Sequence, residues 1–240
     1  QVLSPGAPST QTLPADIAVD LTRGVNDRLA QACAANPKRL AAFAALPTAV
    51  PEAAADELER CVATHGFKGA MIHGPSNGEF LDLKKFWPIY ERAEKLDVPV
   101  YIHPHIPPAP VREAYYSGLE EGACRVIATA AWGWHQETAV HLLRMVLAGT
   151  LDKHPKLKVI IGHMGEMIPV MLARMDAVSS LDIGHLQRKI SETILDQVWI
   201  TTSGIFTQPP FLAALQTFGI DRIMFSVDYP YAPNQAGRRF

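Results

Sequence analysis

The chain has 240 residues and a formal net charge of -2 at pH 7, and 48% of its residues are hydrophobic. This balance argues against a nucleic-acid partner, which requires a basic face, and no apolar run approaches the roughly 20 residues of a membrane span. Three cysteines without CxxC spacing predict neither a disulfide framework nor a thiolate metal site, so we expect a cytoplasmic protein.

Short apolar segments alternate along the chain with amphipathic ones, which is the pattern of a parallel sheet covered by helices. Strands that are buried on both faces form near-continuous apolar runs. The predicted strands are Leu40–Leu46, Lys68–His73, Val98–His103, Val159–His163, Val198–Ser203 and Arg222–Asp228. Length and pattern together favour one α/β domain over residues 1–240, built as a TIM-like (β/α)8 barrel.

Helices are predicted between these strands from their capping signals and apolar stripes. Glu52–Thr64 begins after Pro51 and ends before Gly66, a typical pair of helix boundaries. Lys84–Leu96 and Glu137–Leu147 carry apolar stripes at helical spacing. The stretch Tyr115–Trp134 shows no clean period, so we expect an irregular excursion over the site or at an interface.

Both ends of the sequence interrupt the barrel pattern. Val2-Leu3-Ser4 is apolar and fits the end of a second barrel strand, and no helix is predicted after Arg239. We therefore expect a piece of a longer protein that contains seven of eight strands and lacks the first strand and the C-terminal helices.

Chemically active side chains stand at the ends of the predicted strands. The apolar runs finish at His73, His103, His163, Ser203 and Asp228, and four of these five offer a ligand or an acid/base group. The carboxyl ends of barrel strands converge on one mouth, where active sites of this fold lie. A doubly wound sheet gathers such ends only near its switch point, so the pattern favours a barrel.

His103 and His105 form a His-Pro-His element after an apolar strand. Imidazole nitrogens suit zinc, manganese or iron, so His103, still attached to the strand, is a predicted metal ligand. His105 follows Pro104, and for it a hydrogen bond within the loop is the simpler expectation.

His163 lies between two glycines, and Glu166 follows it near a predicted helix start. Glycines allow a tight turn and a close approach of a ligand, which favours a functional histidine over a buried structural one. Asp228 ends a strand so apolar that its carboxylate needs a partner or a cation. Arg174, on the helix after His163, is by itself explained equally well as a surface cation or as a partner of Asp176.

These residues resemble a known family. His-Pro after a strand, Gly-His-Met-Gly-Glu followed by Pro and Arg-Met-Asp, and Ser-Val-Asp-Tyr-Pro are similar to the motifs of the decarboxylase branch of the amidohydrolase superfamily. That branch includes γ-resorcylate, 2,3-dihydroxybenzoate and 5-carboxyvanillate decarboxylases and, more distantly, aminocarboxymuconate semialdehyde decarboxylase. The resemblance covers nearly the whole chain.

The resemblance implies a role for each matching residue. His103 and Asp228 would bind one divalent metal ion, zinc or manganese before magnesium, and His163 would act beside it with Glu166 as its supporting acid. Arg174 would clamp the substrate carboxylate, and Tyr231 would lie against the substrate ring. The family's first strand supplies further metal ligands, which would precede Gln1.

One departure concerns the substrate. His73 stands where the resorcylate-type enzymes resemble one another in having asparagine, which argues against a dihydroxybenzoate. We keep His73 as a predicted substrate-binding residue.

Three functions remain open at this stage. The first is a metal-dependent, non-oxidative decarboxylase of a small aromatic or unsaturated carboxylic acid, with Asp228 or His163 as the proton donor. The second is a metal-dependent hydrolase of the lactonase or amidase type, in which Asp228 would be the general base. The third is a scaffold that has lost its metal. The family implies a homodimer or homotetramer, and Trp132 and Trp134 fit either an interface or a substrate lid.

Overall fold

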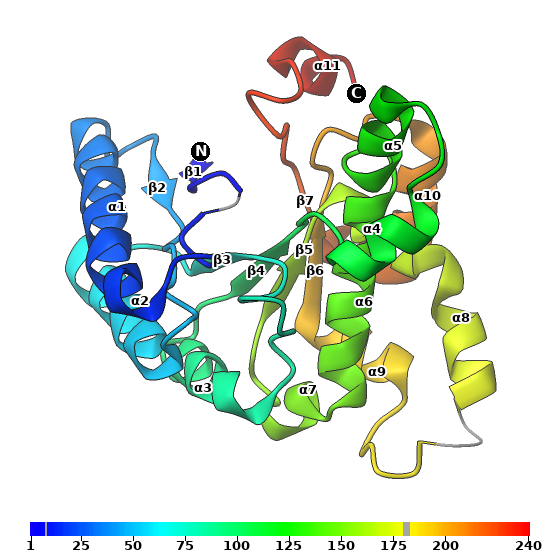
Figure 1. Cartoon of the computed structure of the whole chain (residues 1–240), viewed down its shortest axis with the longest axis horizontal. Helices are drawn as coiled ribbons and strands as arrows, with labels where there is room; N and C mark the ends of the chain where they lie inside the picture. Colours follow the sequence, from blue (N-terminus) through cyan, green and yellow to red (C-terminus); the bar gives the residue numbers. More distant parts are fainter. Residues whose placement is uncertain (8, 180–182) are drawn as a thin grey trace.

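The computed structural model describes residues 1–7, 9–179 and 183–240. Within these residues, parallel strands lie side by side in chain order, in a sheet of two and a sheet of five (Figure 1). A parallel bridge between Ala44 and Ala70 joins the two sheets. The strands are β1 (Val2–Leu3), β2 (Ala41–Ala42), β3 (Ala70–His73), β4 (Val100–His103), β5 (Val159–Ile161), β6 (Val198–Thr201) and β7 (Ile223–Met224).

Helices lie outside this curved row of strands, as a barrel requires (Figure 1). The helices are α1 (Ala15–Ala35), α2 (Pro51–His65), α3 (Trp87–Lys95), α4 (Ala109–Tyr115), α5 (Glu121–Ala128), α6 (Gly133–Leu147), α7 (Thr150–Lys153), α8 (Ile168–Ser179), α9 (Ile190–Gln197), α10 (Gln208–Phe218) and α11 (Asn234–Arg239). The fold is therefore the predicted α/β barrel arrangement, with β1 and β7 as open edges in the described residues.

The capping signals placed α2 well, whereas α1, the longest of the described helices, was not predicted. Pro51 occupies the first turn of α2, and Gly66 ends it in a left-handed conformation at φ 68°. The predicted helix Lys84–Leu96 is divided into a short 3₁₀ helix, Lys84–Phe86, and α3. Pro88 explains the division, because proline is tolerated only in the first turn of an α-helix.

Four of the six predicted strands end earlier than expected, including Leu40–Leu46, of which only Ala41–Ala42 is strand. His73 and His103 are still strand residues, whereas His163, Ser203 and Asp228 lie beyond β5, β6 and β7. These last three residues have φ values of 48°, 34° and 66°. A left-handed residue does not fit within a strand, so none of these three positions belongs to the sheet.

The expected irregular stretch Tyr115–Trp134 proved partly wrong, because it contains α5 and borders α4 and α6. Helix α5 has only eight residues, so its period hardly repeats in the sequence. Its apolar residues Val126 and Ile127 are exposed, so the helix does not bury an apolar face in the core.

The two faces of the five-stranded sheet carry different side chains. Ile72, Ile102, Ile161 and Ile200 pair in register across β3 to β6 and are fully buried. Because successive strand residues point to opposite faces, the neighbouring positions belong to the other face. That face carries Tyr101, His103 and Thr201 together with the apolar Met71, Ile160 and Trp199, so one face is apolar at these positions and the other is mixed.

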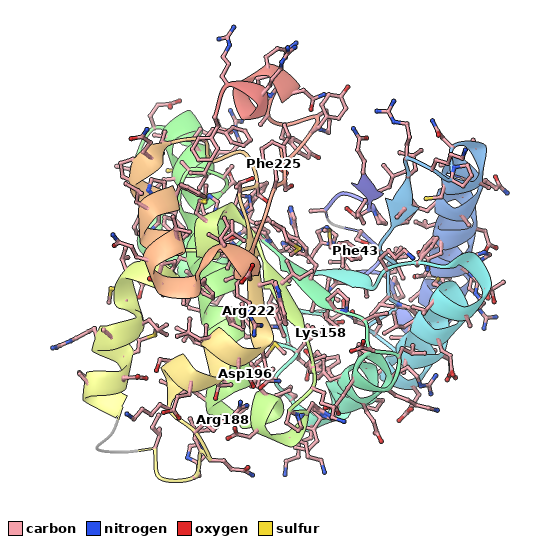
Figure 2. The ribbon with its side chains drawn as sticks, turned by 180° about the vertical axis from the view of Figure 1, so that it is seen from behind. Phe43, Lys158, Arg188, Asp196, Arg222 and Phe225 are labelled. Atoms are coloured by element: carbon pink, nitrogen blue, oxygen red, sulfur yellow. The ribbon has the colours of Figure 1, made fainter. Side chains whose placement is uncertain are left out.

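Charged side chains near the amino ends of the strands have interaction partners. Lys158, before β5, pairs with Asp97 at 2.6 Å, and Arg222, before β7, lies over the Trp199 ring at 3.9 Å. Figure 2 shows Asp196 and Arg222 toward this end of the sheet and Phe225 toward the opposite end. Among the described residues, no helix is long and apolar enough to cross a membrane.

Candidate active site

Four imidazole rings form a row at the carboxyl ends of the strands. The ring of His73 lies 4.8 Å from that of His103, which lies 6.3 Å from His163. His163 in turn lies 4.6 Å from His135, at the start of α6. The structure thus brings together three histidines that the sequence singled out, and it adds a fourth.

His103 has the hydrogen bonding of a metal-binding imidazole. Its Nδ1 lies 2.8 Å from the carbonyl oxygen of Pro104, which can only accept, so Nδ1 carries the proton. The lone pair is therefore on Nε2, and a hydrogen bond of this kind is what commonly orients a histidine ligand. Burial lowers the pKa of His103 and keeps the ring neutral, as metal binding requires. The residue fits a metal ion.

His73 is a buried imidazole with a ring nitrogen that makes no hydrogen bond. Its side chain is 1% exposed, and its Nδ1 has no hydrogen-bond partner. Burial, followed by the nearby charges of His103 and His105, lowers the pKa of His73 to about 3. The ring is therefore neutral at physiological pH.

The Gln11 side chain forms hydrogen bonds with the backbone of His73 and Gly74. Its side-chain carbonyl accepts from the His73 backbone N–H, and its Nε2 donates to the Gly74 carbonyl at 3.2 Å. The amide thus pairs with the end of β3 as a neighbouring strand would, and it is itself 1% exposed.

Glu166 is shared between two histidines. Its Oε1 lies 2.6 Å from Nδ1 of His163, and its Oε2 lies 2.7 Å from Nδ1 of His135. Burial alone would raise the pKa of Glu166, but the charges and hydrogen bonds of both histidines lower it. The three groups lie within 4.8 Å, close enough to surround a cation, yet both carboxylate oxygens already accept from a ring. We therefore interpret them as a hydrogen-bonded triad.

The backbone that carries this triad is strained. Residues 163–167 all have positive φ, between 48° and 85°, and four of these five are not glycine. Each left-handed non-glycine residue costs on the order of 1 kcal/mol, and such residues cluster at functional sites. Ser203 and Asp228 share this conformation, so the carboxyl ends of three strands are strained together.

A ring of hydroxyl groups lies beneath the histidines. Tyr101 Oη contacts Thr201 Oγ1 at 3.0 Å and Ser203 Oγ at 3.2 Å, and the latter two are 2.5 Å apart. Burial raises the pKa of Tyr101 to about 12, so the phenol stays protonated. Gly162 gives this group its room, since a Cβ there would lie 2.9 Å from Tyr101 Oη.

Asp228 belongs to the same mouth. It is half-buried, and a Cβ on Gly204 would lie 3.7 Å from its Oδ2. Its charge acts on His103, His135 and Tyr101. The carboxylate therefore lies within electrostatic range of the imidazoles.

Two predicted residues lie apart from the row. Arg174 is exposed on α8, and no hydrogen bond or ion pair joins it to the histidines. Asp176, the alternative partner, instead accepts from the backbone and the hydroxyl of Ser191. Tyr231 is 79% exposed at the rim, with its hydroxyl beside Gly6.

His135 and Gln11 were missed by sequence reasoning. His135 follows Trp-Gly-Trp in the stretch that showed no clean period, and a glycine before a histidine was the only available signal. Gln11 lies in a loop that carries no motif.

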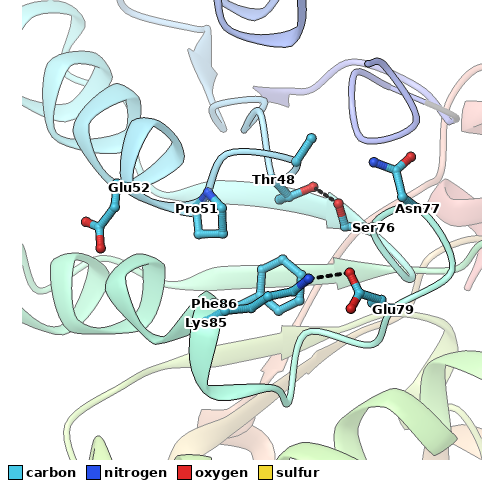
Figure 3. A pocket seen from close by; sticks show the side chains of 9 residues that line it. Thr48, Pro51, Glu52, Ser76, Asn77, Glu79, Lys85 and Phe86 are labelled. Carbon is cyan, nitrogen blue, oxygen red and sulfur yellow. Dashed lines mark hydrogen bonds and ion pairs between the residues drawn. The ribbon is translucent and has the colours of Figure 1, made fainter. Parts of the chain in front are cut away.

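A small cavity lies away from these groups. It has a volume of about 230 Å³ and is bounded by Pro51 of α2 and by the loop that follows β3. Figure 3 shows Thr48 bonded to Ser76 and Lys85 paired with Glu79 on its walls. None of the candidate site residues lines it.

Known proteins resemble the chain over almost its whole length. The amidohydrolase family model matches residues 2–239. The gamma-resorcylate decarboxylase of Rhodococcus jostii is 38% identical, over 96% of this chain and 72% of that protein. The crystal structure of 2,6-dihydroxybenzoate decarboxylase from Rhizobium has a TM-score of 0.90 at 36% identity, over 99% of this chain and 75% of that one.

A third relative was solved with a metal. The dihydroxybenzoic acid decarboxylase from Polaromonas, with bound manganese and the inhibitor 2-nitroresorcinol, has a TM-score of 0.91 at 36% identity. This match covers 99% of the present chain and 73% of that chain. The resemblance inferred from the motifs is confirmed, and the chain belongs to the amidohydrolase family.

Proposed function

We propose that the protein is a metal-dependent, non-oxidative decarboxylase of a small aromatic or unsaturated carboxylic acid. The observation that carries this proposal is the geometry of the mouth. His103 presents a free Nε2 beside the His163–Glu166 pair, and Asp228 lies at the same rim. Relatives named as decarboxylases support the reaction class.

We propose one divalent metal ion, with His103 and Asp228 among its ligands. Manganese is favoured over zinc and magnesium, because a related decarboxylase was crystallised with it. When bound, such an ion would stabilise negative charge on a substrate oxygen.

The residues of this chain would then perform the proton transfer. Asp228 or His163 delivers a proton to the ring carbon that bears the carboxylate. The carbon–carboxylate bond breaks, CO2 leaves, and the bonding electrons return to the π-system. Glu166 holds Nδ1 of His163, which fixes the direction of its Nε2. The neutral His73 ring would line the substrate, and Tyr231 would border it from the rim.

Arg174 remains the proposed clamp on the substrate carboxylate, but its place on α8 separates it from the row in its own chain. The role therefore requires α8 to approach the mouth of another copy. We accordingly propose a homodimer or homotetramer, consistent with the exposed apolar residues Val170 and Met171 on the same helix. A cytoplasmic location is proposed from the free thiols of Cys33, Cys61 and Cys124.

Product analysis tests the reaction. The protein would be loaded with Mn²⁺ and incubated with a panel of hydroxybenzoates and lactones while CO2 is recorded. We expect CO2 from at least one acid and none after treatment with a chelator. Ring opening of a lactone, with no CO2 from any acid, would instead establish the hydrolase alternative.

A further inference from the structure

His135 is bonded to acceptors at both ring nitrogens. Its Nδ1 lies 2.7 Å from Glu166 Oε2, and its Nε2 lies 2.8 Å from the carbonyl oxygen of Ala130. A carbonyl oxygen cannot donate, so the Nε2 contact is a hydrogen bond only if that nitrogen carries a proton. This arrangement differs from those of His103 and His163, each of which uses one nitrogen.

The protons of the triad can be counted. Three hydrogen bonds join Glu166 to His163, Glu166 to His135, and His135 to Ala130, and each needs one proton. A carboxylate and two neutral imidazoles supply two protons between them. The geometry therefore requires one further proton, and with it the net charge of the three side chains becomes zero.

The extra proton belongs with His135 rather than with the carboxylate. The Glu166 side chain is fully buried, and a buried carboxylate needs a compensating cation. Burial alone would lower the pKa of His135, but the hydrogen bond to Glu166 and the charge of that carboxylate raise it. The charge of Asp228 acts in the same direction.

We propose that His135 is an imidazolium in the resting protein and serves as the fixed counter-ion of Glu166. His163 then keeps its proton on Nδ1 and a lone pair on Nε2, which leaves Asp228 as the proton donor of the proposed mechanism. His135 acts through its neighbours, so it is a positioning residue. The inference rests on the proposed function only for the role of His163, since the charge on His135 is measurable without substrate.

Nitrogen NMR tests the charge directly. Long-range ¹H–¹⁵N correlation spectra of ¹⁵N-labelled protein would be recorded at pH 8 with no added metal and again with diamagnetic Mg²⁺. We expect both nitrogens of His135 to be protonated and His163 to be the neutral Nδ1–H form. His141 provides an internal control, because its Nε2 accepts from the Leu81 N–H and burial lowers its pKa to about 4. A neutral His135 at pH 8 would overturn the proposal.

Two variants show whether the charges are coupled. In Glu166→Gln the carboxylate is lost, so His135 should become neutral at pH 8. In His135→Gln the buried carboxylate loses its cation, so the free energy of unfolding should fall. The decarboxylation rate of His135→Gln should fall about tenfold with KM unchanged, because Glu166 is no longer held in place beside His163.

The opposite results are equally informative. A His135→Gln variant as stable as the wild type, or a His135 that stays charged in Glu166→Gln, would contradict the counter-ion role. If His135→Gln does not fold, the spectra of the wild-type protein and of Glu166→Gln decide the question alone. If the NMR result holds but no acid is decarboxylated, the charge assignment stands and the proposed function fails.

Discussion

The two ends of the sheet differ in how their polar groups are used. At the amino ends, Lys158, Arg188 and Arg222 each have a charged, aromatic or backbone partner. At the carboxyl ends the backbone is strained, and His73 keeps an unpartnered nitrogen. The comparison teaches that consecutive strained residues gather at the carboxyl ends, where active sites of this fold lie, while the amino ends are joined by ordinary ion pairs.

The largest effect is expected from the carboxylate at the mouth. Asp228→Asn should lower the decarboxylation rate by about 10²- to 10⁴-fold, because the amide cannot deliver the same proton. Steady-state kinetics and metal content measured by mass spectrometry would check this. Asp196→Asn, at the amino ends, is the matched control and should retain the wild-type rate. Equal losses of decarboxylation rate in the two variants would contradict a catalytic role that is specific to the carboxyl ends.

Acidification should destabilise the protein through its buried histidines. The pKa values of His73 and His141 in the folded state, about 3 and about 4, lie below the ordinary value of 6.5. A depressed histidine pKa gives stability that is complete above pH 6.5 and is lost as the pH falls toward 4. Each group should cost about 2 kcal/mol between pH 7 and pH 5.

Urea titrations of metal-free protein at the two pH values would measure this loss. His141→Gln should reduce the pH dependence by about the share of one group. A pH dependence that is unchanged in the variant would show that His141 does not titrate as inferred.

The space at Gly162 gives a sharper test of the carboxyl ends. Gly162→Ala would place a methyl group 2.9 Å from Tyr101 Oη and 3.6 Å from Glu166 Oε1. The crowding should cost about 1–3 kcal/mol of unfolding free energy and lower the decarboxylation rate. Gly24→Ala in α1 is the control, since nothing lies within 4 Å of its Cβ, and it should be neutral or stabilising. Thermal unfolding of both variants would distinguish the outcomes.

The smallest effect is expected at the amino ends. Lys158 donates to Asp97 at 2.6 Å, and the two side chains are 37% and 79% exposed, so solvent screens the pair. Lys158→Ala should therefore cost no more than about 1 kcal/mol and leave the decarboxylation rate unchanged. A large loss of activity, measured at a temperature where the variant is folded, would contradict the division of roles between the ends.

The strands and their terminal histidines could be predicted because buried strands form apolar runs, and these runs alternate with amphipathic helical segments in the sequence. His73 and His103 follow apolar runs, and both are strand residues at the mouth. His135 could not be found in this way, since its partner Glu166 is 31 residues away and no periodicity links them.

The apolar pattern of the sequence also did not predict where the backbone turns. The left-handed conformations of His163 and Asp228 depend on packing around them, so the predicted strands continued too far. The position of Arg174 could not be predicted either. Helical spacing does not show in which direction α8 runs from the sheet. The roles of the site residues remain predictions that the proposed measurements address.

The Gln11 amide has a consequence for how this protein could change its selectivity. It ties a loop that belongs to no strand onto the same stretch of β3 that carries His73. A change in that loop would therefore reach the imidazole through a single side chain, without disturbing the packed isoleucines on the opposite face. Under the proposed role of His73 in lining the substrate, a change in this loop would therefore alter acid recognition and leave the packed core in place.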